Sequence, residues 1–573
     1  MATLTHQLCN LTNLERIGRF RFKFPRMGKH VPKHTTRFLE RSLKKAIWTN
    51  CSASLAEQAI NGYYRSPTDP LSGEQDFLKT DQPYHPIPRD YHYRRALRVF
   101  EKLFRPRRRL QPIHFADLPH YPWTLNTSAE FPYSTSPYWR EYVRQKCNEG
   151  EIDSTTVNFH NLYNEIFEDN RWKIHKIKEG QEPFWKDGEP VPFGFTFLHS
   201  RSHMRKTGED PKIRAVFGVP KLLLMAEQMF IWNLQREYQN RPLHEGPLLW
   251  GYETFRGGWK KLEQRLCKTK FNSILSADWS GFDHKALHEL IDDVHSIWRS
   301  WFDFDNGYEP SVDIEHDYAR TGTDPQRLEN LWRWMCHSIK HTPIVAESGN
   351  IYRWRFNAIA SGFQQTQLLD TAVNCIMKFT CLSACGINIE SKDFQALFQG
   401  DDSISVFPER VDFQRFLPLM RDEAERRFNA TLSVDKTTCG EWLDGIEVLS
   451  YQYRGGFAYR DPSQLLAHLL YPEHPRDEPR TMAACIGIAT ASMGVSRELY
   501  DTCLDQFNFL ASFGHEPDFS HKEFFWWPKT KTFPTYEETW LQNFDLRERT
   551  ESDRQGLWPT IPRGRKGFRF LQP

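Results

Sequence analysis

Residues 394–407 read FQALFQGDDSISVF, in which two short runs of strand-forming residues flank a glycine and two adjacent aspartates. This pattern predicts a β-hairpin with both carboxylates at its tip. Two such charges about 4 Å apart repel by roughly 1 kcal/mol in water and about 4 kcal/mol in a partly shielded site. A bound cation turns this repulsion into attraction. The stretch therefore indicates a metal site, although Gly-Asp-Asp by itself also suits a solvated turn.

A second acidic segment lies upstream. In SADWSGFD, Asp278 ends a predicted strand and Asp283 follows five residues later, where the chain turns into a helix. If the strand and the hairpin are neighbours in one sheet, their carboxylates meet. We expect Asp278 and Asp401 to share a cation, with Asp402 in support or on a second ion, because side chains alternate along a strand. With no histidine or cysteine partner, these oxygen ligands favour Mg²⁺ or Mn²⁺.

Between these segments lies SGFQQTQLLDTAVN, at residues 361–374. The loop-forming Ser361 and Gly362 precede a predicted helix with one polar face, which carries Thr366, Asp370 and Asn374. A row of small hydrogen-bonding groups suits a ribose hydroxyl and a nucleic-acid backbone. An ordinary amphipathic helix is the alternative interpretation.

Taken in order, the three segments resemble the motifs of viral RNA-directed RNA polymerases, specifically the partitivirus-like group of double-stranded RNA viruses, with picobirnavirus polymerases as close relatives. DWSGFD resembles motif A, SGxxxT with the downstream Asn374 resembles motif B, and GDD resembles motif C. Their order and phasing are far more specific than any one of them alone.

A further segment resembles motif G, the loop that guides template. This is TSAEFPY at 127–133, where Glu130 replaces the glycine usual in picornavirus-like enzymes. The resemblance implies template contacts from Thr127, Ser128 and Pro132.

Three more segments resemble family motifs. KIRAVFGVPK looks like motif F, whose cations hold triphosphate, so the resemblance gives Lys212 and Arg214 that role. LSVDKTTCG is similar to motif D and nominates Lys436 as the proton donor to the leaving pyrophosphate. VLSYQYRGGFAYRDP, at 448–462, resembles the primer-grip hairpin of motif E.

The resemblance implies an α+β right-hand polymerase, in which fingers, a palm with an antiparallel sheet and a helical thumb are closed by N-terminal extensions. The boundaries that we expect are 1–110 for the N-terminal extension bridging fingers and thumb, 111–272 for the fingers, 273–302 for the palm with motif A, 303–350 for a fingers insertion, 351–462 for the palm with motifs B to E, and 463–573 for the thumb and C-terminal tail.

Local patterns predict several elements independently. Residues 65–90 hold five prolines and little periodicity, which indicates an extended strap. Residues 284–302 carry an apolar stripe at helical spacing, directly after a predicted strand. DPQRLENLWRWMCHSI, at 324–339, predicts an inserted helix between motifs A and B, and residues 463–510 read as mostly helical.

The implied activity is RNA-directed RNA synthesis that replicates and transcribes a double-stranded RNA virus genome by two-metal-ion nucleotidyl transfer. Two Mg²⁺ ions, or Mn²⁺, would be bridged by Asp278 and Asp401. The 2′-hydroxyl would be read by Asp283 and Asn374, with Ser361 or Thr366. Implied partners are RNA template and nascent strand, NTPs and a viral capsid protein, in the host cytoplasm inside the virus particle.

The formal net charge is only +2, but basic residues crowd the N-terminal segment. Residues 16–45 hold eleven lysines and arginines against one glutamate, which suits an arm that guides RNA or contacts the capsid. The first thirty residues have no apolar signal region, and the longest apolar stretch, 219–232, is interrupted by charge. We therefore expect an intracellular, soluble protein without a membrane partner.

Two other functions remain open from the sequence. A reverse transcriptase also uses paired aspartates, but it usually carries an aromatic residue and Met or Ala before them, where this chain has Gln399 and Gly400. A non-catalytic double-stranded-RNA-binding or capsid-associated protein would account for the basic ends and the aromatics. It does not explain ordered carboxylates on loops.

Overall fold

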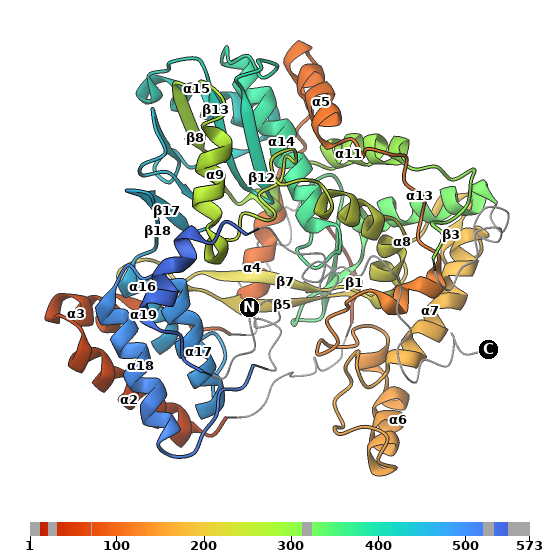
Figure 1. The fold of residues 1–573 in the computed structure, drawn as a ribbon. Coiled ribbons are helices and arrows are strands. Elements are labelled where there is room, and N and C mark those ends of the chain that lie inside the picture. Colours follow the sequence, from red (N-terminus) through yellow and green to blue (C-terminus); the bar gives the residue numbers. More distant parts are fainter. Residues whose placement is uncertain (1–11, 21–30, 70, 312–323, 520–531, 548–573) are drawn as a thin grey trace.

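The computed structural model describes residues 12–20, 31–69, 71–311, 324–519 and 532–547. These residues form a mixed α+β structure, as the sequence predicted, with helices around two larger sheets (Figure 1). Within those ranges, none of the helices is both long enough and apolar enough to cross a membrane.

A four-stranded antiparallel sheet contains the Gly-Asp-Asp stretch and has the order β12–β13–β8–β15. Its strands are β12 (Gln395–Gln399), β13 (Asp402–Phe407), β8 (Ser273–Ser276) and β15 (Thr438–Gly440). The predicted hairpin over 394–407 is confirmed, because β12 and β13 pair from Gln395↔Val406 to Gln399↔Asp402. Gly400 lies in the turn with a φ of 60°, a left-handed conformation that glycine adopts without strain.

Both faces of this sheet are buried. Ile274 belongs to the part of the core that includes helix α9 (Gly258–Leu266), whereas its neighbour Leu275 belongs to the part that includes helix α14 (Thr366–Ala384). Burial on both sides explains why apolar residues stand next to each other in β8 (Ile274 and Leu275) and in β12 (Ala396, Leu397 and Phe398). Helix α14 packs against β12 and β13, next to the aspartate turn (Figure 1).

A five-stranded sheet has the order β1–β11–β10–β5–β7. Its strands are β1 (Leu14–Arg19), β11 (Asn350–Trp354), β10 (Ile344–Val345), β5 (Thr196–Ser202) and β7 (Ile213–Gly218). The pairs are antiparallel except β10 with β5. The N-terminal strand is thus joined to a strand more than 300 residues further along the chain.

The prediction of an extended strap over 65–90 is wrong for its middle part. Residues Ser72–Phe77 form the short helix α4, which packs against β5 and β7. Phe77 is fully buried, and its ring lies 5.4 Å from that of Tyr352 between centroids. The prolines flank this helix, so they limit its length without preventing it.

The helix predicted over 284–302 is divided. Residues Phe282–Lys285 form α10 and His288–Trp301 form α11. Ala286 between them has extended backbone, and its carbonyl accepts a hydrogen bond of 2.7 Å from the Ala358 amide. Asp283 therefore lies on a separate short helix.

The predicted inserted helix is confirmed as α13, Pro325–His341.

The C-terminal helices and the N-terminal helices pack together as a helical lobe, defined here as α2, α3, α16, α17 and α18 (Figure 1). The bounds are α2 (Lys33–Asn50), α3 (Ala53–Asn61), α16 (Pro462–Leu470), α17 (Glu478–Ala491) and α18 (Arg497–Ala511). The helical character predicted for 463–510 is confirmed. The lobe has its own apolar core, which contains Leu43, Ile47, Leu466 and Leu499.

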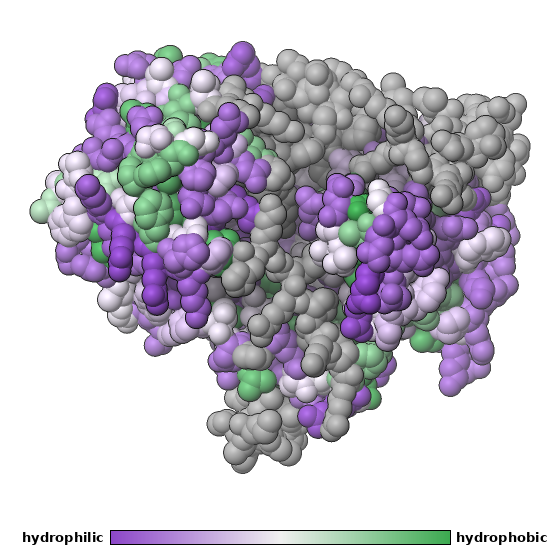
Figure 2. Space-filling model, turned by 90° about the horizontal axis from the view of Figure 1, so that it is seen from below, coloured by the Kyte–Doolittle hydropathy of each residue, from purple (hydrophilic) through white to green (hydrophobic). Residues whose placement is uncertain are grey.

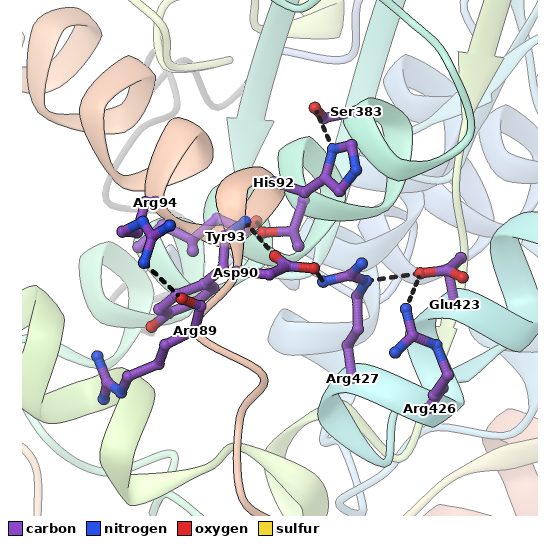
Figure 3. A network of polar contacts seen from close by, with 11 residues as sticks. Arg89, Asp90, His92, Tyr93, Arg94, Ser383, Glu423, Arg426 and Arg427 are labelled. Atoms are coloured by element: carbon purple, nitrogen blue, oxygen red, sulfur yellow. Dashed lines mark hydrogen bonds and ion pairs between the residues drawn. The ribbon is translucent and has the colours of Figure 1, made fainter.

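An ion-pair network joins helix α5 (Tyr91–Phe104) to helix α15 (Phe413–Phe428), as Figure 3 shows. The Arg427 guanidinium lies between the carboxylates of Asp90, at 2.9 Å, and Glu423, at 2.6 Å. Its side chain is only 4% exposed. Next to this network, Ser383 of α14 contacts His92 at 2.9 Å. These contacts fix α5 against the elements that support the sheet.

We expect Arg427→Ala to destabilise the protein by about 3 kcal/mol, because it leaves Asp90 and Glu423 without their shared cation. This value is at the low end for a broken buried ion pair, since Asp90 remains accessible to water. The measurement is the thermal unfolding midpoint. Arg421→Ala, on the same helix but exposed, is the matched control, and equal midpoints for the two variants would contradict the assignment.

Candidate active site

The carboxylates of the Gly-Asp-Asp turn and of the SADWSGFD segment lie close together, at one end of the central strands β13 and β8 of the four-stranded sheet. Strand β13 pairs with β8 from Phe407↔Ser273 to Ser405↔Leu275, so the start of β13 at Asp402 lies at the same end of the sheet as the end of β8 at Ser276, two residues before Asp278. Asp401 lies in the adjacent turn. Burial, followed by repulsion from Asp401 and Asp278, raises the pKa of Asp402 to about 7. The charges of the three aspartates therefore act on one another.

The turn is held by helix α14. The Asn374 side-chain amide donates to the carbonyls of Gly400 and Asp401, each at 2.9 Å, and its carbonyl accepts from the Trp279 indole at 2.8 Å. Asn374 is fully buried, so both ends of its side chain are used within the protein. The Thr371 hydroxyl accepts from the Gly400 amide at 2.8 Å. One helix thus fixes the backbone of the aspartate turn and the Trp279 side chain of the other acidic segment.

Lys378 lies one helical turn beyond Asn374 and is also fully buried. Its ammonium donates to the Ser403 hydroxyl at 2.9 Å and to the Leu275 carbonyl at 3.3 Å. Burial lowers the pKa of Lys378 to about 7. The sequence analysis did not assign Lys378 or Thr371. Extending the four-residue spacing of the polar face by one turn would have found Lys378.

Asp283 and Asp370 form a second acidic pair beside the turn. Asp283 is exposed to solvent, and desolvation together with repulsion from Asp401 raises its pKa to about 6. Asp370 is buried, and its Oδ1 has no hydrogen-bond partner among the described residues. Burial and repulsion from Asp283 raise the pKa of Asp370 well above its usual range. The sequence analysis recorded Asp370 on the polar face without giving it a role.

Cations face these carboxylates from another part of the chain. Arg214, on β7, is exposed and lies close to Asp401 and Asp283. Burial raises the pKa of both carboxyls, and the positive charge of Arg214 offsets part of this rise. Burial and the charges of Arg214 and Lys436 lower the pKa of Lys212. The predicted residues Lys212, Arg214 and Lys436 are thus brought together.

The loop that carries Lys436 is bonded to the aspartate strand. The Ser433 amide donates to the Asp278 carbonyl at 2.8 Å, and the Asp278 amide donates to the Thr437 hydroxyl at 3.2 Å. Lys436 itself is exposed.

The hairpin expected over 448–462 is confirmed as β17 (Tyr451–Arg454) and β18 (Phe457–Tyr459).

The loop before α14 packs against β7. A Cβ on Gly362 would lie 2.3 Å from the Phe217 carbonyl, so only glycine fits at this position. The Thr366 hydroxyl donates to the Ala360 carbonyl at 2.8 Å, while Ser361 remains exposed. In the same loop, the backbone amides of Gln364 and Gln365 donate hydrogen bonds to the buried carboxylate of Glu227.

The residues that resemble motif G lie elsewhere. Thr127 and Ser128 are half-buried. The Thr127 hydroxyl accepts a long hydrogen bond of 3.5 Å from the ammonium of Lys221, just beyond β7. Glu130 has a φ of 59°, so the position normally held by glycine keeps the conformation that favours glycine. Pro132 follows in the same loop. Thr127 and Glu130 thus lie near the end of β7, since Lys221 follows that strand and a Cβ on Gly218 would meet the Glu130 carboxylate.

Comparison with known proteins agrees with this geometry. Residues 99–511 match the family model described as viral RNA-dependent RNA polymerase. The chain belongs to this family.

Individual relatives extend the match. The chain is 30% identical over 554 residues to the RNA-directed RNA polymerase of White clover cryptic virus 1 (isolate Boccardo/2004), covering 90% of this chain and 89% of that protein. It is 26% identical over 440 residues to the RNA-directed RNA polymerase of Atkinsonella hypoxylon virus (isolate 2H), covering 69% and 64%. It is also similar to that of Cryptosporidium parvum virus 1 (strain KSU-1), at 27% identity over 260 residues.

Proposed function

We propose that this chain joins ribonucleotides by two-metal-ion transfer at the tip of the β12–β13 hairpin. Its general activity follows from its family: it is an RNA-directed RNA polymerase of double-stranded RNA viruses. The observation that supports the proposed site is the pairing of β13 with β8, which brings Asp402 and the Asp401 turn to the end of β8 beside Asp278, close enough for the three charges to act on one another.

The carboxylates suit divalent cations. Among the described residues, no three Asp, Glu, His or Cys side chains are arranged to hold one ion by themselves. Mg²⁺ is usually bound by one or two carboxylates together with water and substrate phosphates, so this arrangement fits it. Asp278 and Asp401 would bind the ions, with Asp402 in support. When bound, the ions activate the primer hydroxyl and neutralise charge on the triphosphate.

The chain's own side chains then divide the remaining work. Lys212 and Arg214 bind the triphosphate and offset its charge. Asp283, which is exposed beside the aspartate turn, accepts a hydrogen bond from the ribose 2′-hydroxyl. Asn374 was predicted to read the same hydroxyl, and its contacts favour a different role, which is to hold the aspartate turn in place. Ser361 and Thr366, with Gly362, shape the loop beside the nucleotide.

The subdomain assignment follows the same proposal. The four-stranded sheet with residues 273–302 and 351–462 corresponds to a palm, residues 111–272 and 303–350 to fingers, and residues 463–573 to a thumb and tail. Residues 1–110 would link fingers and thumb, which is supported by the place of β1 in one sheet with β5 and β7, by the packing of α4 on these two strands, and by the packing of α2 on α18. Thr127, Ser128 and Pro132 would guide the template. A capsid protein as partner, within particles in the host cytoplasm, completes the proposal.

A template-dependent incorporation assay tests the activity. Purified protein is given a primed RNA template with Mg²⁺ or Mn²⁺, and with either NTPs or dNTPs. We expect extension with NTPs only. Preferential use of dNTPs would favour a reverse transcriptase, whereas RNA binding without extension under every metal and primer condition would favour a non-catalytic RNA-binding protein.

Lys436→Leu should slow nucleotide addition by roughly tenfold, the lower end of what one positioned acid contributes. Lys436→Arg keeps the charge with a group that does not release its proton, and it should be equally slow. The measurement is the single-turnover rate at saturating NTP. If Lys436→Arg is as fast as the unmodified enzyme, Lys436 acts through its charge and is not the proton donor.

A further inference from the structure

The outer face of helix α2 carries a row of four cations. Thr35, Leu39, Leu43, Ala46 and Ile47 face the helical lobe and are buried. On the opposite side, every fourth residue is an exposed lysine or arginine, namely Lys33, Arg37, Arg41 and Lys45. At 1.5 Å per residue, this row extends about 18 Å along the helix.

These four cations have no carboxylate partner in the part of the chain that the structure describes. The only acidic residue of α2 is Glu40, which pairs with Lys44 at 2.7 Å. Several exposed arginines on other helices pair with a carboxylate one turn away, as in Arg415–Asp412, Arg426–Glu423 and Arg497–Asp501. The row on α2 has no such pairing and places four cations on one face of a single helix.

Such a row opposes the folding of the helix that carries it. Cations four residues apart lie next to each other on a helix, and like charges at this spacing destabilise it. Glutamine or glutamate at alternate positions would support the same helix better. A polyanion that lies along the row removes this repulsion and releases its own counterions.

An aromatic side chain continues the row. Trp48 follows Lys45 by three residues, so it lies on the same face, and it is 50% exposed. Phe38 is 40% exposed and lies 5.9 Å from Phe509 of α18 between ring centroids. Cations together with exposed aromatic rings are the combination that binds single-stranded nucleic acid, because the bases are free to stack.

We infer that the outer face of α2 binds single-stranded RNA outside the catalytic site, with the four cations on phosphates and Trp48 against a base. The choice of RNA over other polyanions rests on the proposed function. Helix α2 packs mainly on α18, α3, α16 and α17 of the helical lobe and lies far from the β12–β13 hairpin in Figure 1. Seen from below, in Figure 2, the face of this lobe is largely hydrophilic with hydrophobic patches between.

The test uses the full-length chain with Lys33, Arg37, Arg41 and Lys45 all changed to glutamine. Unlabelled primer–template duplex is first added to saturation, so that the catalytic site is occupied, and a labelled unstructured RNA strand is then titrated at several salt concentrations. Each lost phosphate contact reduces the slope of log affinity against log salt by about 0.7. We expect a slope smaller by about 2 to 3 and a Kd at least tenfold weaker at 0.1 M salt. An unchanged slope and Kd would overturn the inference.

A control variant separates this row from net charge. Lys102, Lys176, Lys186 and Lys268 are exposed on other elements, and changing all four to glutamine alters the charge equally. This control should keep the Kd within about twofold of the unmodified chain. An equal loss in the control would mean that only overall charge matters, which would also overturn the inference.

Trp48→Ala tests stacking, with Trp172→Ala as its control because Trp172 is 68% exposed on another helix. Trp48→Ala should weaken binding of the strand about tenfold and leave duplex binding unchanged. Loss of duplex binding alone would contradict a single-strand site.

Nucleotide addition to a preformed primer–template should be normal in every α2 variant. A failure of the proposed catalytic function would show separately, because the unmodified chain would then add no nucleotide.

Discussion

Asp401→Asn is expected to reduce nucleotide addition by about 1,000-fold or more while the protein remains folded. The substitution keeps the size and hydrogen-bonding shape of the side chain and removes the negative charge. Loss of one metal-binding carboxylate removes roughly 4 kcal/mol of transition-state stabilisation, which corresponds to that factor in rate. Asp278→Asn should behave alike.

Rates and metal affinity are measured together. Single-turnover addition gives the rate, and titration with Mn²⁺ gives the apparent affinity, which should fall in both variants. Asp393→Asn is the matched control, since Asp393 lies just before β12 and away from the turn. Undiminished addition by Asp401→Asn would remove Asp401 from the catalytic site.

Asn374→Leu is expected to lower the maximal rate about 100-fold with little change in the ratio of NTP to dNTP use. Leucine fills the buried space but leaves two carbonyls of the aspartate turn and the Trp279 indole without their partner. The loss of such buried hydrogen bonds amounts to about 3 kcal/mol, and its effect on rate depends on how far the turn moves.

The ratio of NTP to dNTP use distinguishes two roles for this residue. If Asn374 positions the turn, addition of both nucleotides slows by the same factor. If it reads the ribose directly, as the sequence analysis predicted, NTP addition slows far more than dNTP addition. Gln367→Leu is the control, because Gln367 is exposed on the same helix and its side chain has no contact with the turn among those described.

Much of the four-stranded sheet was predictable, because its strands are indicated by residues that are close together in the sequence. Two short runs of strand-forming residues on either side of Gly-Asp-Asp gave the β12–β13 hairpin, and the family resemblance gave the order of the acidic segments. Helix α13 and the helices of 463–510 also followed from periodicity. These features depend on neighbours within one turn or one strand.

The features that were missed depend on contacts distant in the sequence. Helix α4 is short and flanked by prolines, and it exists because Phe77 packs against residues about 140 and 275 positions away. The break at Ala286 depends on a hydrogen bond from Ala358. Likewise, whether Asn374 faces a nucleotide or the aspartate turn depends on where the hairpin lies, which the spacing of polar residues along α14 does not specify.

The pairing of β1 with β11 has a consequence for how the protein is made. Residues 14–19 leave the ribosome early, and their partner at 350–354 emerges only after more than 300 further residues. At 5 to 20 residues per second this interval lasts roughly twenty seconds to a minute. During synthesis, therefore, the first strand waits without its neighbour, and the sheet that bears Arg214 closes only when most of the chain is complete.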